Sequence, residues 1–243
     1  MSAAASAPAR DAVAFVAGAT GYTGRAVVRA LVDRGARVLA HVRPDAGRRD
    51  EWRDRFAAMC AEVDTSPWDE AAMTATLSRL RPTQVFALLG TTRARSRAEQ
   101  RSAVEGYERV DYGLTALLLR AAVACGSRPR FVYLSATGVG PGRSNPYLAV
   151  RWRLEEELRA SGLPYVIARP SFITGPDRDE PRAAERIAAT VFDALAGVIS
   201  RVGGRRFADR YRSTTNVALA DALVRLALDP SATAAVVESE RLR

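Results

Sequence analysis

The stretch GATGYTG, residues 18–24, separates two segments that have different hydrophobic patterns. Before it, residues 12–17 (AVAFVA) form a short apolar run rich in β-forming residues, which predicts a buried parallel strand. After it, residues 22–34 carry apolar side chains at a helical spacing and stop at Gly35, a residue type that often ends helices. A glycine turn between a strand and a helix removes the Cβ atoms that would keep a phosphate away from backbone N–H groups. The stretch therefore predicts a phosphate-binding turn.

The glycine spacing is G-x-x-G-x-x-G, which differs from the G-x-G-x-x-G pattern of many dinucleotide-binding loops. A glycine triplet alone is also compatible with a purely structural turn. This triplet, however, follows a predicted strand and precedes a predicted helix, which favours dinucleotide binding. The residues expected to bind the pyrophosphate are Gly18, Thr20, Gly21, Tyr22, Thr23 and Gly24.

Strand and helix patterns alternate along the rest of the chain. Further strands are predicted at residues 37–42, 61–63, 83–90, 131–136, 165–171 and 234–239, and helices at 50–60, 68–80, 98–125, 147–161, 182–197 and 216–228. This alternation predicts an α/β fold, a Rossmann-type doubly wound parallel sheet. We expect a disordered tail over residues 1–11 and a single domain over 12–243, in which 175–243 contributes a small substrate-binding lobe.

The composition is that of a globular chain, with 48% hydrophobic and 26% charged residues. No run of about 18 apolar residues is present, so we expect no membrane span and no membrane partner. Cys60 and Cys125 stand alone, without the spacing of a zinc site or a redox pair. They are expected to be buried small side chains in a reducing cytoplasm, and no metal site is predicted.

The net charge of +9 raises the question of a nucleic-acid partner. All 36 basic residues are arginines, and they are scattered along the chain. No zinc-finger, RRM-like or basic-zipper pattern accompanies them. We therefore expect most of these arginines to be solvated, a few to bind an acidic ligand, and no nucleic acid to be bound.

The end of the second predicted strand bears on the choice between the two nicotinamide cofactors. An acidic residue there would accept hydrogen bonds from the ribose 2′-hydroxyl, whereas an arginine can donate two hydrogen bonds to a 2′-phosphate. Arg43 stands just past the strand. Asp45, beyond Pro44, is the alternative, an acidic residue that would accept hydrogen bonds from the ribose hydroxyl. The sequence therefore predicts NADP(H) in preference to NAD(H). His41, the only histidine, is expected to be packed rather than catalytic.

Two further strand ends contribute candidate cofactor contacts. Asp64 follows the third strand, where its carboxylate can accept from the adenine amino group or serve as a turn or cap residue. Leu89, Gly90 and Thr91 end the fourth strand and are expected beside the cofactor ribose.

Five motifs carry a family resemblance: GATGYTG (18–24), LLGTTR (88–93), FVYLSATG (131–138), YLAVR (147–151) and ARPSFITGP (168–176). Together they resemble the short-chain dehydrogenase/reductase superfamily. More narrowly, they are similar to its atypical NAD(P)-binding branch, the oxidoreductases similar to Tat-interacting protein. The resemblance runs from about residue 12 to 180. It implies a nicotinamide cofactor across the carboxyl ends of the strands and a Ser–Tyr–Lys catalytic group.

The resemblance assigns roles to single residues. Ser135 would hydrogen-bond the substrate carbonyl, and Tyr147 would donate the proton as the hydride arrives. Arg151 takes the position of the family lysine, which supports the tyrosine and holds the nicotinamide ribose. Arginine keeps the charge but is larger and planar, so it can bind the ribose or turn aside and pair with Glu155. Asp111 lies where many relatives have an asparagine, and no role is expected for it.

By the same resemblance, the segment after the sixth strand covers the nicotinamide through Pro170, Ser171, Phe172 and Ile173. The first functional hypothesis is an NADP-dependent oxidoreductase that transfers hydride to or from a small-molecule carbonyl or alcohol. The alternative is a catalytically weak or inactive NADP(H)-binding sensor or scaffold protein that acts through a protein partner. A monomer or a homodimer is compatible with the sequence.

Overall fold

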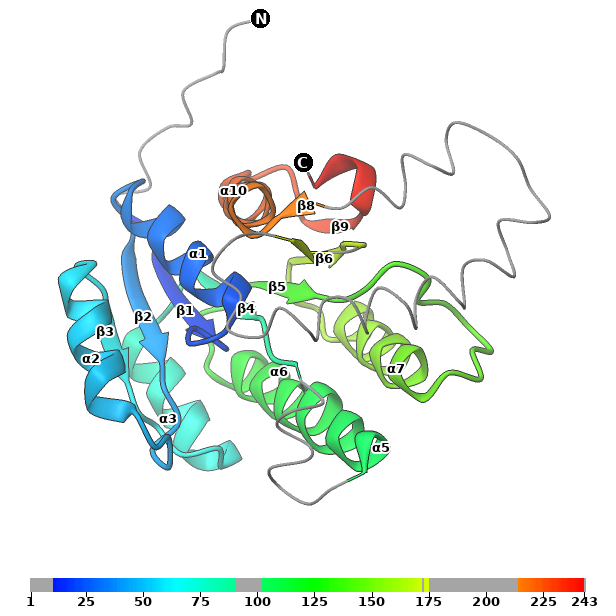
Figure 1. Ribbon diagram of the computed structural model, residues 1–243, viewed down its shortest axis with the longest axis horizontal. Coiled ribbons are helices and arrows are strands. Elements are labelled where there is room, and N and C mark those ends of the chain that lie inside the picture. The colour runs from blue at the N-terminus through cyan, green and yellow to red at the C-terminus, as the bar shows by residue number, and fades with distance from the viewer. Residues whose placement is uncertain (1–10, 91–101, 172, 175–213, 243) are drawn as a thin grey trace, which may run out of the picture.

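The computed structural model describes residues 11–90, 102–171, 173–174 and 214–242. Its main feature is a seven-stranded parallel sheet with the strand order β3-β2-β1-β4-β5-β6-β9 (Figure 1). The strands are β1 (Val13–Ala17), β2 (Arg37–His41), β3 (Glu62–Asp64), β4 (Gln84–Ala87), β5 (Arg130–Leu134), β6 (Tyr165–Arg169) and β9 (Ala234–Glu238). This is the predicted Rossmann-type α/β fold.

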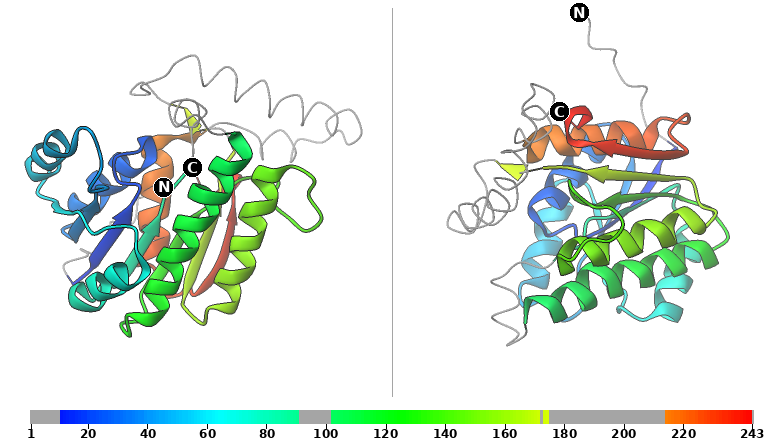
Figure 2. Two further views of the ribbon diagram at one scale, coloured as in Figure 1. Left: turned by 90° about the horizontal axis from the view of Figure 1, so that it is seen from below. Right: turned by 90° about the vertical axis from the view of Figure 1, so that its right-hand side faces the viewer.

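Helices cover both faces of the sheet (Figures 1 and 2). They are α1 (Tyr22–Val32), α2 (Arg49–Ala58), α3 (Glu70–Leu80), α5 (Ala103–Gly106), α6 (Thr115–Ala124), α7 (Pro146–Ala160) and α10 (Asn216–Leu228), with a π-helix at Tyr107–Leu114 between α5 and α6. A short pair of strands, β7 (Ile173–Thr174) and β8 (Thr214–Thr215), lies apart from the main sheet.

The two faces of the sheet have separate cores because successive strand residues point to opposite sides. In β1, Ala14 and Val16 belong to the core under α1, α2 and α10, whereas Phe15 and Ala17 belong to the core under α3, α6 and α7. All four side chains are fully buried. This two-sided burial explains why the strand AVAFVA is apolar throughout rather than alternating.

The order of the strands reverses at β1, which pairs with β2 on one side and with β4 on the other. Ligands of doubly wound sheets bind outside the carboxyl ends of the strands at such a point. The glycine stretch follows β1 directly, so the fold places it there. The ends of β2, β4, β5 and β6 lie along the same edge because every pairing is parallel.

Two parts of the architecture differ in detail from the expectation. The predicted long helix over residues 98–125 is, from Ser102 on, three successive pieces with the π-helix in the middle. The expected C-terminal lobe does not include residues 216–239, because α10 packs against α1 and β9 extends the main sheet beside β6. The predicted helix 182–197 and residues 1–10 of the expected tail lie outside the described residues.

Within the described part of the chain, no helix is both long enough and apolar enough to cross a membrane. In the same part, no group of three or more His, Cys, Asp or Glu side chains is arranged to hold a metal ion.

Candidate functional site

The glycine loop has a geometry that only glycine permits at two of its three positions. Gly18 has φ +83°, and a Cβ on it would lie 2.6 Å from the carbonyl oxygen of Leu88. A Cβ on Gly24 would lie 2.1 Å from the carbonyl oxygen of Gly18. Gly21 is exposed, and its N–H donates to the Gly18 carbonyl at 2.9 Å. The loop is therefore a tight turn with an open outer surface.

Helix α1 starts at this loop with its N-terminus available to an anion. Gly21 is the N-cap residue, so no side chain caps the helix, and the first turn holds no acidic residue. The partial positive charge of a helix N-terminus then faces outward. Thr20 and Tyr22 are half-buried and Thr23 is buried. The residues present fit a dinucleotide pyrophosphate, as the sequence predicts.

A methyl group at Gly24 should disrupt this loop. We expect Gly24→Ala to weaken NADPH binding at least tenfold and to lower the free energy of unfolding by about 1–3 kcal/mol, because the added Cβ meets backbone rather than a flexible side chain. Fluorescence titration and urea unfolding measure the two effects. Arg29→Ala is the control, since Arg29 lies on the exposed side of α1, where it pairs with Asp33. Unchanged NADPH affinity in Gly24→Ala would contradict the assignment of the loop.

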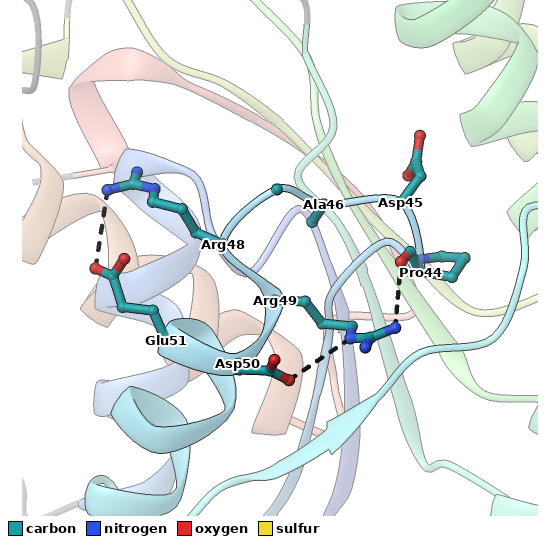
Figure 3. Close-up of a pocket in the computed structure, with 8 residues that line it drawn as sticks. Pro44, Asp45, Ala46, Arg48, Arg49, Asp50 and Glu51 are labelled. Carbon is teal, nitrogen blue, oxygen red and sulfur yellow. Dashed lines mark hydrogen bonds and ion pairs between the residues drawn. The ribbon is translucent and has the colours of Figure 1, made fainter.

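The end of β2 carries arginines around an open hollow of about 540 Å³ (Figure 3). Residues 44–51 line it. Arg43, just before the hollow, is half-buried, and its Nη1 lies 3.7 Å from Asp45 Oδ2. Arg48 and Arg49 pair with Glu51 and Asp50 at 3.8 Å. Such exposed pairs are worth little, so an incoming anion can replace the acidic partners at small cost.

One further arginine reaches this region from α1. The guanidinium carbons of Arg25 and Arg48 lie 5.8 Å and 5.6 Å from the ring centroid of Trp52, so the start of α1 and the loop after β2 meet over this indole. Sequence reasoning missed Arg25, although it follows Gly24 directly. Asp45 is exposed, and in Figure 3 its carboxylate points away from the other labelled side chains.

Asp64 is held in a turn at the end of β3. One of its carboxylate oxygens accepts from the Ser66 backbone N–H at 3.1 Å, and the other accepts from the Ser66 hydroxyl at 2.9 Å. Asp64 therefore serves as a turn residue, which is one of the two roles that the sequence left open. The other role was to bind the adenine. His41 is packed, as expected: it is buried, its Nε2 lies 2.9 Å from the Ser66 carbonyl oxygen, and burial lowers its pKa.

Gly90 lies beside an ion pair that joins two distant parts of the chain. Arg151 Nη2 donates to Asp111 Oδ1 at 2.7 Å, and both side chains are buried. A Cβ on Gly90 would lie 3.8 Å from each of these two atoms. Leu89, half-buried, packs against the core on the α3, α6 and α7 side. Thr91 lies outside the described residues.

The structure answers only one of the two alternatives for Arg151, pairing with Glu155, and ribose binding stays a prediction. Arg151 does not pair with Glu155; besides Asp111, its Nη1 donates to the Leu134 carbonyl at 2.7 Å and to the Tyr133 hydroxyl at 3.3 Å. Asp111, for which no role was expected, is therefore part of the site. The motifs differ from the family pattern at two positions, with Asp111 in place of asparagine and Arg151 in place of lysine. These two differences were the sequence signal for the ion pair.

Tyr147 stands over this arginine. The guanidinium carbon of Arg151 lies 4.5 Å from the centroid of the Tyr147 ring, and the Tyr107 ring meets Tyr147 edge-on at 5.3 Å. Burial raises the pKa of the Tyr147 hydroxyl, the Arg151 cation opposes that shift, and Asp111 adds to it. The net pKa is above that of free tyrosine, so the Tyr147 hydroxyl keeps its proton at neutral pH.

Ser135 is engaged inside the protein, and its expected contact with a substrate carbonyl stays a prediction. It is buried, and its hydroxyl donates to Glu155 Oε1 at 2.6 Å. The reason is that a buried carboxylate is a strong acceptor close to the hydroxyl. Glu155 also accepts from Arg159 and Arg169, and Arg169 extends the network to Glu238. From the sequence, Glu155 was offered only as a possible partner of Arg151, four residues before it on the same helix.

The segment after β6 is tied down by its own contacts. The Pro170 carbonyl accepts from the Thr137 N–H at 2.9 Å, and the Ser171 N–H donates to the Ser239 hydroxyl at 3.2 Å. Ile173 pairs with Thr214 in the short β7–β8 ladder. Phe172 lies outside the described residues. The expected nicotinamide contacts of this segment stay a prediction.

Comparison with protein families finds one match that covers most of the chain. The model of the NAD(P)H-binding family matches residues 18–202, from the first glycine of the loop onward. "Protein fmp52-1, mitochondrial" of Aspergillus terreus is 31% identical over 193 residues, which is 75% of each chain. The ceramide reductase of Caulobacter vibrioides is 31% identical over 182 residues, 74% of this chain and 52% of that protein.

Solved structures agree in fold. An oxidoreductase of the short chain dehydrogenase/reductase family from Burkholderia thailandensis has a TM-score of 0.63 at 19% identity, covering 94% of this chain and 90% of that one. The Bordetella bronchiseptica enzyme WbmH in complex with NAD+ has a TM-score of 0.60 at 19% identity, covering 88% and 71%. The chain thus belongs to the NAD(P)H-binding family, and the atypical short-chain dehydrogenase/reductase branch that its motifs resemble fits this membership.

Proposed function

We propose that this chain is an NADP-dependent oxidoreductase that acts on a small-molecule carbonyl or alcohol. The observation that carries the proposal is the meeting of Tyr147, Arg151 and Gly90 at the carboxyl edge of the sheet, the edge on which the glycine loop lies. A bound reduced nicotinamide supplies a hydride. The Tyr147 hydroxyl then donates the proton to the carbonyl oxygen of the substrate.

The relatives support a reductase without naming a substrate. The similar Caulobacter protein is a ceramide reductase, and a Zea mays relative, 33% identical over 178 residues, is a divinyl chlorophyllide a 8-vinyl-reductase. This chain spans 52% and 41% of their lengths, and their substrates have different chemistry. We therefore propose the reaction class alone. The expected cytoplasmic location stays a prediction, since the fungal relative is named as mitochondrial.

The arginines at the end of β2 support the preference for NADP(H). Arg43 follows β2 on the edge where the ribose 2′-position of a cofactor is read in this fold. Its acidic partner among the described residues, Asp45, lies at 3.7 Å and is largely exposed. A 2′-phosphate offers a doubly charged acceptor in place of that weak contact.

Replacing Arg43 by alanine should remove this preference. We expect the Kd for NADPH to rise about ten- to a hundredfold and the Kd for NADH to change little, because a hydrogen bond to a charged group is worth about 1.5–3 kcal/mol. Parallel fluorescence titrations with the two cofactors measure the ratio. Arg29→Ala is the control, since it removes the same charge from the exposed side of α1, where Arg29 pairs with Asp33. An unchanged ratio in Arg43→Ala would refute the NADP(H) assignment.

One observation favours the second candidate, a sensor or scaffold that binds NADP(H) without turnover. The Ser135 proton is donated to Glu155, and Arg151 already donates to Asp111, Leu134 and Tyr133. Two of the three expected catalytic groups are thus engaged within the protein. Consumption of NADPH with a panel of carbonyl compounds separates the candidates, because only the oxidoreductase produces an alcohol and oxidised cofactor.

A further inference from the structure

The π-helix that carries Asp111 is an unusual element in a functional position. It runs over eight residues, Tyr107–Leu114, between the short helix α5 and the regular helix α6. π-Helical turns are rare and often occur at functional sites, because the wider turn re-aims a side chain. In this protein the π-helix contains Asp111, which is 2% exposed and whose carboxylate accepts a hydrogen bond from Arg151.

Asp111 and Arg151 form a buried pair of opposite charges. The side-chain exposures are 6% for Arg151 and 1% for Asp111, and Nη2 and Oδ1 are 2.7 Å apart. The Leu134 carbonyl and the Tyr133 hydroxyl fix the other terminal nitrogen of the guanidinium. The arginine is thus held in one orientation below the Tyr147 ring.

The charged groups that face Tyr147 from the described elements are one cation and one carboxylate, and two phenols lie beside them. Arg151 comes from the same helix, α7, and Asp111 and the phenol of Tyr107 come from the π-helix. The phenol of Tyr133 comes from β5. A lone cation in place of this pair would favour the phenolate, whereas the neutral pair leaves the effect of burial dominant.

We propose that Asp111 is a positioning residue that pairs with Arg151 and keeps Tyr147 a proton donor through neutral and mildly alkaline pH, the form that carbonyl reduction requires. The inference rests on the proposed function. In the reduction, the Tyr147 O–H bond breaks and its proton goes to the carbonyl oxygen, while a hydride from the reduced nicotinamide forms the new C–H bond. The tyrosinate regains a proton from water.

The test is a titration of Tyr147 in the full-length protein without cofactor. Ultraviolet difference spectra of tyrosinate are recorded against pH for the parent chain and for Tyr147→Phe, and their difference isolates Tyr147. We expect Asp111→Asn to lower the pKa of Tyr147 by on the order of one unit, about tenfold more tyrosinate at a given pH. The matched control is Glu108→Gln, which removes a carboxylate from the exposed side of the same π-helix.

A second variant covers the case in which Asp111→Asn does not fold because it leaves a buried cation without its counter-ion. Asp111→Asn combined with Arg151→Gln removes both charges, so we expect the pKa of Tyr147 to stay within a few tenths of a unit of the parent value. A rise of about one unit or more in the double variant would overturn the proposal, since it would mean that Arg151 acts on Tyr147 without compensation by Asp111. An unchanged pKa in folded Asp111→Asn would overturn it as well.

These results are independent of the proposed function. Failure of the parent chain to bind NADPH or to reduce any carbonyl would refute the oxidoreductase and leave the titration interpretable. Where the chain is active, the pH at which carbonyl reduction declines should move down in Asp111→Asn by the same amount as the pKa of Tyr147. A structural role of Asp111 alone would change the amount of folded protein and not this pH.

Discussion

Tyr147→Phe is expected to reduce carbonyl reduction by about 10²–10⁴-fold while NADPH affinity stays nearly unchanged. The change removes the one oxygen that donates the proton and keeps the ring that packs between Tyr107 and the guanidinium of Arg151. The raised pKa of Tyr147 gives the sign of the pH dependence. Reduction needs the protonated phenol, so its rate should be constant through neutral pH and fall only as pH rises through that pKa.

Steady-state kinetics with NADPH and a carbonyl panel, together with a fluorescence titration of cofactor affinity, measure both effects. Tyr165→Phe is the matched control, because Tyr165 begins β6 at the opposite edge of the sheet from the candidate site. The control should retain full activity. Parent-like turnover in Tyr147→Phe would exclude Tyr147 as the proton donor, and NADPH binding without turnover in the parent chain would favour the sensor.

The fold could be predicted because the strands and the first helix are specified by residue patterns that are local in the sequence. The run AVAFVA is buried on both faces, and the glycines that follow are required by contacts within the loop and with Leu88. Helix α10 has the predicted bounds, 216–228, since its N-cap Thr215 and its apolar spacing are local signals. Apart from the contact between Gly18 and Leu88, these signals are local in the sequence.

The site was predicted only in part, because its partners are far apart in sequence. Arg151 and Asp111 are 40 residues apart, and Ser135 and Glu155 are 20 apart. Spacing along one helix offered Glu155 as one possible partner of Arg151, but β5 and β6 bring Ser135 and Arg169 to that carboxylate instead. The π-helix was also missed, since the pattern of apolar residues over 98–125 is that of an ordinary helix.

Glu155→Ala is expected to lower the free energy of unfolding by about 3 kcal/mol, the lower end of the cost of breaking a buried ion pair. Glu155 is fully buried, and it accepts from Ser135, from two nitrogens of Arg169 and from Arg159. Its loss leaves the guanidinium of Arg169, which is 12% exposed, with Glu238 as its remaining acidic partner among the described residues. Because Arg169 keeps Glu238 as a partner, we expect a loss of stability at the lower end of that range. Urea unfolding followed by circular dichroism measures the change.

Glu156→Ala supplies the comparison, because Glu156 is the next residue of α7 and binds the same Arg159, at 2.7 Å, from the exposed side. Its loss should cost less than about 1 kcal/mol. Equal effects of the two substitutions would show that the buried network adds no stability. A large difference would show that Glu155 fastens α7 to β5 and β6. Since α7 also carries Tyr147 and Arg151, the network would then hold the proposed proton donor in place from the opposite end of the helix.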